Sequence, residues 1–379
     1  MDGPALKQAI GELARSLGFS ALGVADAGPI DDAGHLRRWL DAGQHAGLEY
    51  MARTAAERID ARPLCRGRAR SVVVLTTPYR HPWPARPAGL RGRVSRYASG
   101  RDYHRVIQRR LRKLRRAIVQ WRPGTHVYAS VDTGPVMEKA WAERAGLGWV
   151  GKHGNLITRD RSSWVFLSVL ALDVALPADA PHAEHCGTCD LCIRACPTDA
   201  IVSPGVVDAG ACIAYHTIEH DGVMPPALRA QHGDWVFGCD DCQDVCPWNR
   251  FADQAPDGDP HFAPTQDRAF PDLVALLEMP AAEFASRFEG TPLARAARDG
   301  LARSAALALG NRGDASAVPA LVRALHQDAH APVRAHAAWA LGRLGGQAAQ
   351  AALRDAHAHE KDDTVRREID EVLRSGVAE

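Results

Sequence analysis

The sequence predicts an α+β protein that ends in α-helical repeats. Strand and helix patterns follow one another up to about residue 175 without the strict alternation of βαβ units. From about residue 290 the chain is rich in alanine, and Ala308-Leu309-Gly310 recurs after 32 residues as Ala340-Leu341-Gly342. A repeat of this length is typical of helix pairs stacked as in HEAT proteins. With a cysteine-rich stretch between these parts, we expect three domains, at residues 1–175, 176–260 and 261–379.

In the first domain, hydrophobic periodicity indicates a short series of helices and strands. An amphipathic helix over residues 4–17 precedes a strand at 19–25 and a helix at 35–40. The β-branched run 71–76 is typical of a buried strand, and residues 126–131 alternate like a strand. A helix is expected at 138–145. Residues 156–158 and 164–172 are expected to pair as a hairpin.

A long helix after Tyr103 has one apolar stripe and several basic faces. Between Arg101 and Arg122 there are nine Lys or Arg and one acid, Asp102, although the net charge of the chain is only +1. Such charge usually marks a solvated face, and it also suits contact with a polyanion. The sequence leaves both interpretations open. The stripe consists of Ile107, Leu111, Leu114, Ile118 and Trp121.

Eight of the nine cysteines lie between residues 186 and 247, in two blocks that each end in Cys-Pro, with Cys212 between them. The first block has the spacing Cys-x2-Cys-x2-Cys-x3-Cys-Pro of bacterial ferredoxins, in which the fourth cysteine ligates the other [4Fe–4S] cluster. We therefore expect a ferredoxin-like domain with two clusters that pass single electrons. By this logic one cluster is held by Cys186, Cys189, Cys192 and Cys246. The second is held by Cys196, Cys212, Cys239 and Cys242.

Zinc and disulfides are the alternative explanations of these cysteines. Cys-x2-Cys pairs are common in zinc sites, but zinc sites do not usually combine x2, x2 and x3 spacings with a following proline. Disulfides suit exported proteins, and the first residues lack the basic segment and apolar run of a signal peptide. No apolar stretch is long enough to cross a bilayer. We expect a cytoplasmic protein without membrane contact, in which Cys65 is a buried hydrophobe.

Asp132 is the acidic residue that most suggests chemistry. It ends an expected strand just before Thr133-Gly134-Pro135, where a carboxyl can exchange protons at the mouth of a pocket. It could equally cap the following helix, and the spacing does not decide between the two. The glycine-rich turn 146–154 has His153 where a P-loop needs Ser or Thr, and no Gly-x-Gly-x-x-Gly opens a helix. A nucleotide site is therefore not expected.

Several longer motifs occur in a fixed order along the chain. They are Tyr97-Ala98-x-Gly100-x-Asp102-Tyr103-His104, Val131-Asp132-Thr133-Gly134-Pro135, Gly148-Trp149-x-Gly151-Lys152, Thr217-Ile218-Glu219 and Gly238-Cys239-Asp240-x-Cys242-Gln243-x-Val245-Cys246-Pro247-Trp248-Asn249. With these motifs, the isolated Cys212 and the HEAT-like tail, the chain resembles epoxyqueuosine reductases over nearly its whole length. These are the cobalamin-dependent iron–sulfur enzymes of queuosine tRNA modification.

The resemblance implies a corrinoid-binding N-terminal domain and a reaction. That reaction removes the epoxide oxygen of epoxyqueuosine in the tRNA wobble position with two electrons and gives queuosine, the last step of its biosynthesis. Reduced cobalt would engage the epoxide carbon, and Asp132 matches the proton donor, with a pKa raised by burial beside the corrin. The cobalamin is expected base-off, because Ile107 replaces the glycine that would complete Asp-x-His-x-x-Gly at Asp102-x-His104.

The resemblance also implies individual contacts and partners. The basic helix and the HEAT-like module would be the tRNA surfaces, with Asp221 as a tRNA contact. A monomer is expected, with electrons supplied by a donor such as flavodoxin or ferredoxin. The implied cobalamin contacts are Arg58, Asp132, Leu156, Leu167, Ala214, Cys239 and Asp240.

Two other functions are alternatives to this one. A corrinoid reductive dehalogenase shares cobalamin and paired clusters, but exported dehalogenases carry a twin-arginine leader and no HEAT-like tail is expected on one. A non-enzymatic electron-transfer adaptor would leave Asp132 and about 180 residues before the clusters without a role.

Overall fold

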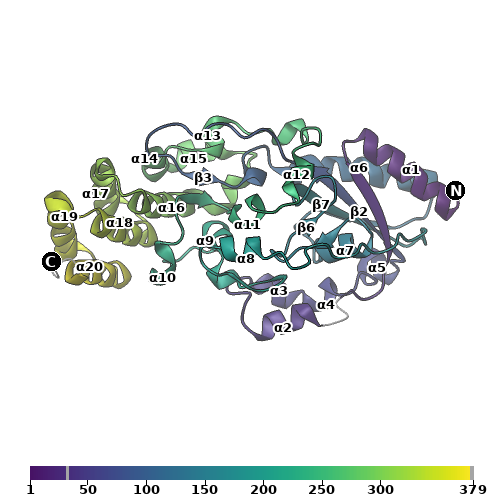
Figure 1. The fold of residues 1–379 in the computed structure, drawn as a ribbon, viewed down its shortest axis with the longest axis horizontal. Helices are drawn as coiled ribbons and strands as arrows, with labels where there is room; N and C mark the ends of the chain where they lie inside the picture. Colours follow the sequence, from purple (N-terminus) through teal and green to yellow (C-terminus); the bar gives the residue numbers. More distant parts are fainter. Residues whose placement is uncertain (31–33, 376–379) are drawn as a thin grey trace. The chain divides into compact units, whose positions relative to one another are not determined.

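The computed structural model describes residues 1–30 and 34–375. The chain divides into two compact units that each combine several segments (Figure 1). Unit 1 contains residues 1–82, 101–210 and 240–263. Unit 2 contains residues 83–100, 211–239 and 264–379. The division into three domains stays a prediction.

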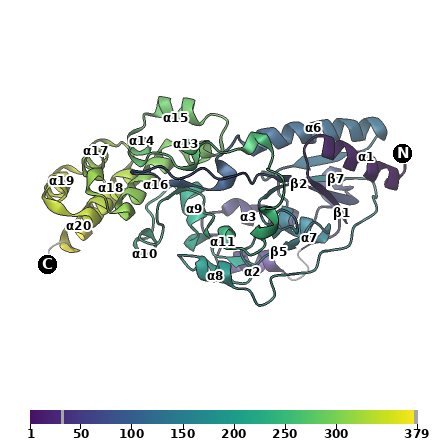
Figure 2. The ribbon, with the colours of Figure 1, turned by 45° about the horizontal axis from the view of Figure 1, so that its top comes forward.

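Unit 1 is built on a four-stranded antiparallel sheet in the order β1-β2-β7-β4. Its strands are β1 (Ala21–Asp26), β2 (Ser71–Pro78), β7 (Val165–Leu172) and β4 (Val127–Ser130). The helices α1 (Gly3–Ser16) and α6 (Tyr103–Trp121) pack on one face, and α7 (Glu138–Arg144) packs on the other (Figures 1 and 2). Because helices cover both faces, β2 is buried along its whole length.

Shorter elements complete unit 1, and three of them contain a cysteine: Cys65 in α5, Cys192 in α8 and Cys242 in α11. The thiol of Cys65, in α5, is buried and donates to the carbonyl oxygen of Ala171 at 2.9 Å, so the expectation of a buried residue is confirmed. The elements are α2 (His35–Asp41), α3 (Glu49–Arg53), α4 (Ala55–Arg58), α5 (Leu64–Gly67), β5 (Trp149–Val150), β6 (Leu156–Ile157), α8 (Leu191–Ala195), β8 (Ile201–Ser203), β9 (Val206–Val207), α11 (Asp241–Asp244), α12 (Asn249–Ala252) and η3 (Pro260–Phe262).

The expected hairpin between residues 156–158 and 164–172 is wrong. The short strand β6 pairs with β5, and β7 pairs along its whole length with β2 and along half of it with β4. Only an isolated bridge between Thr158 and Ser162 remains of the hairpin. β7 is apolar on both faces, so it gains most by lying in the centre of the sheet between two partners.

Unit 2 combines a small parallel pair of strands with a stack of helices. β3 (Arg93–Val94) pairs with β10 (Trp235–Phe237). The expected repeat is confirmed, since its two glycines lie at helix crossings: a Cβ on Gly310 would meet Ala340 at 2.9 Å, and one on Gly342 would meet Val372 at 2.4 Å. The helices are η1 (Arg96–Ala98), α9 (Ile213–Ile218), α10 (Pro226–Arg229), α13 (Gln266–Ala269), α14 (Leu273–Glu278), α15 (Ala281–Phe288), η4 (Pro292–Ala296), α16 (Ala297–Arg312), α17 (Val318–Gln327), α18 (Ala331–Leu344), α19 (Gly346–His359) and α20 (Asp363–Ser375).

Among the helices of the described residues, none combines the length and the apolar character that crossing a lipid bilayer demands.

A buried ion pair ties α10 to the last repeat of unit 2. Arg229 donates two hydrogen bonds to the Glu368 carboxylate, at 2.5 and 2.9 Å, and both side chains are buried. Glu368→Gln should destabilise unit 2 by about 3 kcal/mol, because it leaves the Arg229 charge buried without its counter-ion. Urea denaturation followed by circular dichroism checks this. Glu278→Gln breaks an exposed pair with Arg323 and should cost under about 1 kcal/mol; equal losses in both variants would contradict the prediction.

Candidate functional site

Asp132 lies at the apex of a tight turn at the end of β4. The N–H of Thr133 donates to the carbonyl oxygen of Val131 at 2.6 Å, and Asp132 has a φ of 59°. Positive φ is rare for residues other than glycine, and strained turns of this kind are concentrated at functional sites. Asp132 does not cap α7, because the helix begins at Glu138 after Met137 and no side chain in the described ranges caps it. The alternative of a helix cap is therefore wrong.

The Asp132 carboxyl is held by two residues at the start of α6. The Tyr103 hydroxyl donates to Asp132 Oδ2 at 2.6 Å, and His104 Nε2 lies 3.0 Å from the same oxygen. The other ring nitrogen of His104, Nδ1, lies 2.8 Å from Asp102 Oδ1. Tyr103 is in turn stacked between His104 and Phe166 of β7, at centroid distances of 4.0 and 4.3 Å. The carboxyl oxygen that faces these donors is thus fixed, while the Asp132 side chain stays 60 % exposed.

His104 carries the strongest electrostatic signal of this group. Burial opposes its protonation, but the hydrogen bonds to Asp102 and Asp132, together with the charges of both carboxylates, raise its pKa to about 9. His104 is therefore an imidazolium near neutral pH, and both of its ring nitrogens donate. The protonated imidazole of His104 is therefore hydrogen-bonded to the exposed carboxyl group of Asp132.

A second acid, Glu138, lies close to this group at the start of α7. Burial, with a smaller contribution from the Asp132 charge, raises the pKa of Glu138 to about 7. Its Oε1 is buried and finds no hydrogen-bond partner within the part of the chain that the structure describes. Arg58 is buried as well and donates to the Val136 carbonyl oxygen at 3.4 Å, in the segment that joins Asp132 to α7.

The structure brings three of the expected cobalamin contacts together in unit 1. Arg58 contacts Val136, and Val136 belongs to the same apolar cluster as Leu156, with Leu167 packed against it. Leu156 is only 3 % exposed, whereas Leu167 is half-buried. Leu167 lies near the end of β4, because it is two residues from Val169, the partner of Ser130 in the sheet.

The remaining predicted contacts belong to other segments. Asp240 is buried in unit 1 at the start of α11. Ala214, on α9, and Cys239, just after β10, belong to unit 2. Asp221 lies beyond the end of α9 and is exposed. Each of these site roles stays a prediction.

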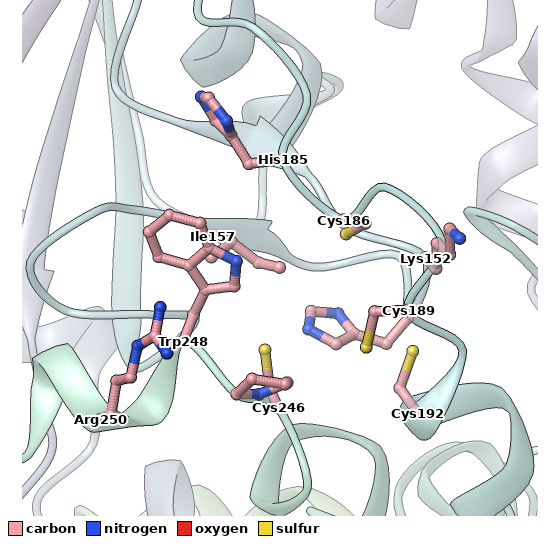
Figure 3. A pocket seen from close by; sticks show the side chains of 11 residues that line it. Lys152, Ile157, His185, Cys186, Cys189, Cys192, Cys246, Trp248 and Arg250 are labelled. Carbon is pink, nitrogen blue, oxygen red and sulfur yellow. The ribbon is translucent and has the colours of Figure 1, made fainter.

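The first predicted set of cysteines converges on one cavity in unit 1. Figure 3 shows the side chains of all four around a common space, with Trp248 and Lys152 beside them. The cavity has a volume of about 220 Å³, far more than a single metal ion occupies. Three of its ligand candidates come from the loop before and the first turn of α8, and one follows α11. The four are Cys186, Cys189, Cys192 and Cys246.

Burial raises the pKa of the Cys192 thiol, and repulsion from Cys186 and Cys246 raises it further. The protein alone therefore favours neutral thiols here, and thiolates in this cavity need a compensating cation or cluster. Trp149 Nε1 and Ser162 Oγ are buried and make no regular hydrogen bond with the residues described. Trp149 nevertheless lies close to Cys186, and as a hydrogen-bond donor it lowers the pKa of the Cys186 thiol. Burial has the larger effect and raises that pKa. Ser162 lowers the pKa of the Cys246 thiol in the same way as Trp149 does for Cys186.

The second predicted set draws two cysteines from each unit. Cys196 follows α8 and Cys242 lies on α11, both in unit 1; the Sγ of Cys196 accepts from the N–H of Ala200 at 3.2 Å. In unit 2, Cys212 precedes α9 and Cys239 follows β10. A hydrogen bond links α9 to the residue after β10: the Gly238 N–H donates to Thr217 Oγ1 of α9 at 2.9 Å. The ligation of a cluster by this set stays a prediction.

α6 presents a basic face whose N-terminal end adjoins Asp132. Its apolar stripe is buried as expected, with Ile107, Leu111, Leu114 and Ile118 at no more than 1 % exposed. Arg110 is turned inward to pair with buried Asp259, which also belongs to unit 1. The exposed basic residues of α6 are Arg105, Arg109, Arg112, Lys113, Arg115 and Arg116.

Comparison with known proteins identifies the family. Residues 58–133 match the family model described as "Epoxyqueuosine reductase QueG, DUF1730", residues 185–249 match a "4Fe-4S double cluster binding domain", and residues 291–374 match "HEAT repeats". The chain therefore contains the double cluster domain that its cysteine spacing predicts.

Several complete proteins match this chain over most of its length. The epoxyqueuosine reductase of Xanthomonas campestris pv. campestris is 41% identical over 88% of this chain and 94% of that protein, and the one of Pseudomonas aeruginosa is 42% identical over 91% and 96%. A crystal structure of epoxyqueuosine reductase with an epoxyqueuosine-modified tRNA stem loop superposes with a TM-score of 0.91, at 30% identity over 99% of both chains. The chain belongs to the epoxyqueuosine reductase family.

Proposed function

We propose that this protein reduces epoxyqueuosine in the wobble position of tRNA to queuosine. The reaction takes up two electrons and two protons: both C–O bonds of the epoxide break, a C=C bond forms, and the oxygen leaves as water. The observation that carries the proposal is the exposed Asp132 carboxyl, held by Tyr103 and His104 in a strained turn. A relative of the same family has been crystallised with an epoxyqueuosine-modified tRNA stem loop, which supports tRNA as the partner.

The proton chemistry follows from the contacts of Asp132. His104 faces Asp132 as an imidazolium beside a carboxylate, so Asp132 passes on to the leaving oxygen a proton that it takes from His104 as the C–O bond breaks. The Tyr103 hydroxyl keeps the carboxyl oriented. The expected burial of Asp132 beside the corrin stays a prediction, since in the protein alone its side chain is 60 % exposed. The imidazolium of His104 would supply the proton.

The electron chemistry requires a group that the amino acids do not supply. Bound base-off cobalamin would provide a low-potential, nucleophilic two-electron centre. The residues expected to hold this group fit it in kind, because Leu156 and Leu167 suit its apolar macrocycle and Arg58 can donate to its amide side chains. Asp132, Ala214, Cys239 and Asp240 would complete the contacts.

The proposal extends to the partners. The exposed arginines of α6 would bind the tRNA backbone next to Asp132, with Asp221 and the HEAT repeats as further contacts. A one-electron donor such as flavodoxin or ferredoxin would load the clusters, and a monomer in the cytoplasm suits a tRNA substrate.

Asp132→Asn should slow deoxygenation about 10²- to 10⁴-fold, because the amide cannot protonate the leaving oxygen. The assay uses anaerobically reconstituted protein, cobalamin, a strong reductant and tRNA carrying epoxyqueuosine, and mass spectrometry of the digested tRNA detects the loss of one oxygen. Asp26→Asn, another exposed carboxyl at a strand end, is the matched control and should react as the wild type does. A wild type that carries clusters and cobalamin but converts nothing would sink the proposed function.

His104→Gln should change the pH profile of the same reaction. In the wild type, the raised pKa keeps His104 protonated, so activity should persist through neutral pH and fall as the pH rises through about 9. The variant should be slower and should lack this descending limb. Single-turnover rates across the pH range measure both effects. His126→Gln removes another histidine paired with a carboxylate in unit 1 and should keep the wild-type profile; the same limb in His104→Gln would contradict the assignment.

Replacing Arg109, Arg112 and Arg116 by Gln distinguishes the two interpretations of the basic helix. If α6 contacts phosphates, tRNA affinity should fall and the slope of log K against log salt concentration should become shallower by about 2 to 3. If α6 only presents a solvated face, both quantities should stay unchanged. Arg66→Gln with Arg68→Gln, exposed residues of unit 1 elsewhere, is the control.

A further inference from the structure

His153 is held in place by the turn that joins β5 to β6. The Gly151 N–H donates to the carbonyl oxygen of Asn155 at 2.9 Å, and the Gly154 N–H donates to that of Gly151 at 2.8 Å. Lys152 Nζ donates to the carbonyl oxygen of Gly187 at 2.6 Å, in the loop between Cys186 and Cys189. The turn is therefore fixed directly against the cysteine loop of the first cluster.

The ring of His153 lines the same cavity as the four cysteines and is buried, with 4 % of the residue exposed. An added Cβ on Gly151 would approach His153 Cε1 to 3.2 Å and Ile157 Cδ1 to 2.5 Å. The glycine thus leaves the room that the ring needs. Because the ring is enclosed from these sides, its orientation is set by the fold of the turn.

The hydrogen bond of one ring nitrogen determines the role of the other. The Asn155 N–H donates to His153 Nδ1 at 3.1 Å, so Nδ1 carries no proton. An imidazole whose Nδ1 accepts a hydrogen bond carries its single proton on Nε2. This Nε2–H is a buried donor that meets no acceptor among the residues the structure describes.

We propose that His153 Nε2–H donates a hydrogen bond to a sulfur of the [4Fe–4S] cluster held by Cys186, Cys189, Cys192 and Cys246, and thereby raises its reduction potential. Hydrogen bonds to cluster sulfurs are among the main determinants of the potential, since they stabilise the more negative reduced form. The indole of Trp149 and the hydroxyl of Ser162 already lie near the thiols of Cys186 and Cys246. His153 adds a buried donor that lines the cavity itself and meets no acceptor among the described residues.

This inference rests on the double cluster domain and not on the proposed reaction. Its test therefore uses the full chain loaded with both clusters, without cobalamin or tRNA. Potentiometric titrations followed by electron paramagnetic resonance resolve two one-electron steps. His153→Leu should lower one midpoint by about 59 mV, the equivalent of a tenfold change in the equilibrium constant, and leave the other in place.

His153→Gln is the conservative partner of that variant, because its amide nitrogen can occupy nearly the position of Nε2. It should retain most of the wild-type potential. His126→Leu, a histidine of unit 1 outside the cavity, should shift neither midpoint. Unchanged midpoints in His153→Leu with full iron content would overturn the proposal.

A spectroscopic readout keeps the proposal testable if His153→Leu fails to assemble its clusters. Wild-type protein grown with ring-¹⁵N histidine should show a weak nitrogen coupling to the reduced cluster in pulsed electron paramagnetic resonance. The coupling should disappear in His153→Gln, which has no imidazole at this position. Absence of a coupling in the wild type, or its persistence in His153→Gln, would show that His153 does not contact the cluster.

Discussion

Four cysteine sulfurs lie around one cavity in unit 1, and holding them together as thiolates costs free energy. Each thiolate raises the pKa of its neighbours, so the set is stable only when a cation or cluster neutralises it and when donors surround it. Those donors come from the β5–β6 hairpin and from the bend before β7. The hairpin is short, yet it contributes Trp149 and His153, and Lys152 fixes it to the cysteine loop. The unusual feature of this cavity is therefore its lining of buried N–H and O–H groups.

Strand β7 connects the cysteine cavity to the turn that carries Asp132. Just before the strand, Trp164 Nε1 donates to Asn249 Oδ1 at 2.8 Å, close to Cys246 in sequence. Two residues further on, Phe166 stacks on Tyr103, whose hydroxyl holds Asp132. Tyr79 contacts both aromatic rings, at centroid distances of 6.1 and 4.6 Å. The central strand β7 thus helps to position both the segment that carries Cys246 and the side chain of Asp132.

The sequence predicted what depends on local spacing and missed what depends on distant contacts. The cysteine pattern grouped Cys246 with a block that begins 60 residues earlier, and the cavity brings these residues together. The repeat offset identified the stacked helices because each glycine lies at a crossing. By contrast, the pairing of β7 with β2 depends on a partner about 90 residues away in the chain, and periodicity carries no information on that choice.

The titratable residues of the site show the same limit of prediction from sequence. Asp132 was found from its place at a strand end, but neither its exposure nor the role of His104 follows from the motif in which both occur. Glu138 reads as an ordinary helix residue, and its raised pKa arises only from burial beside Asp132. In the sequence, His153 is notable only because it stands where a P-loop needs Ser or Thr. An unpartnered donor such as its Nε2–H becomes visible only once the tautomer can be assigned from a contact, here the N–H of Asn155.

The exposure of Asp132 has a physical rationale in a two-electron reduction. An acid that is buried and neutral on its own would need no partner, but it could not reach a bulky nucleoside. In the proposed reaction an exposed carboxyl would reach the substrate, and its proton would come from His104, whose pKa the neighbouring carboxylates raise. The same logic holds at the cluster, where a neutral donor stabilises added electrons without carrying a charge of its own. In both places the protein uses a histidine, protonated at the exposed site and neutral in the buried one, and the difference follows from the carboxylates that surround only the first.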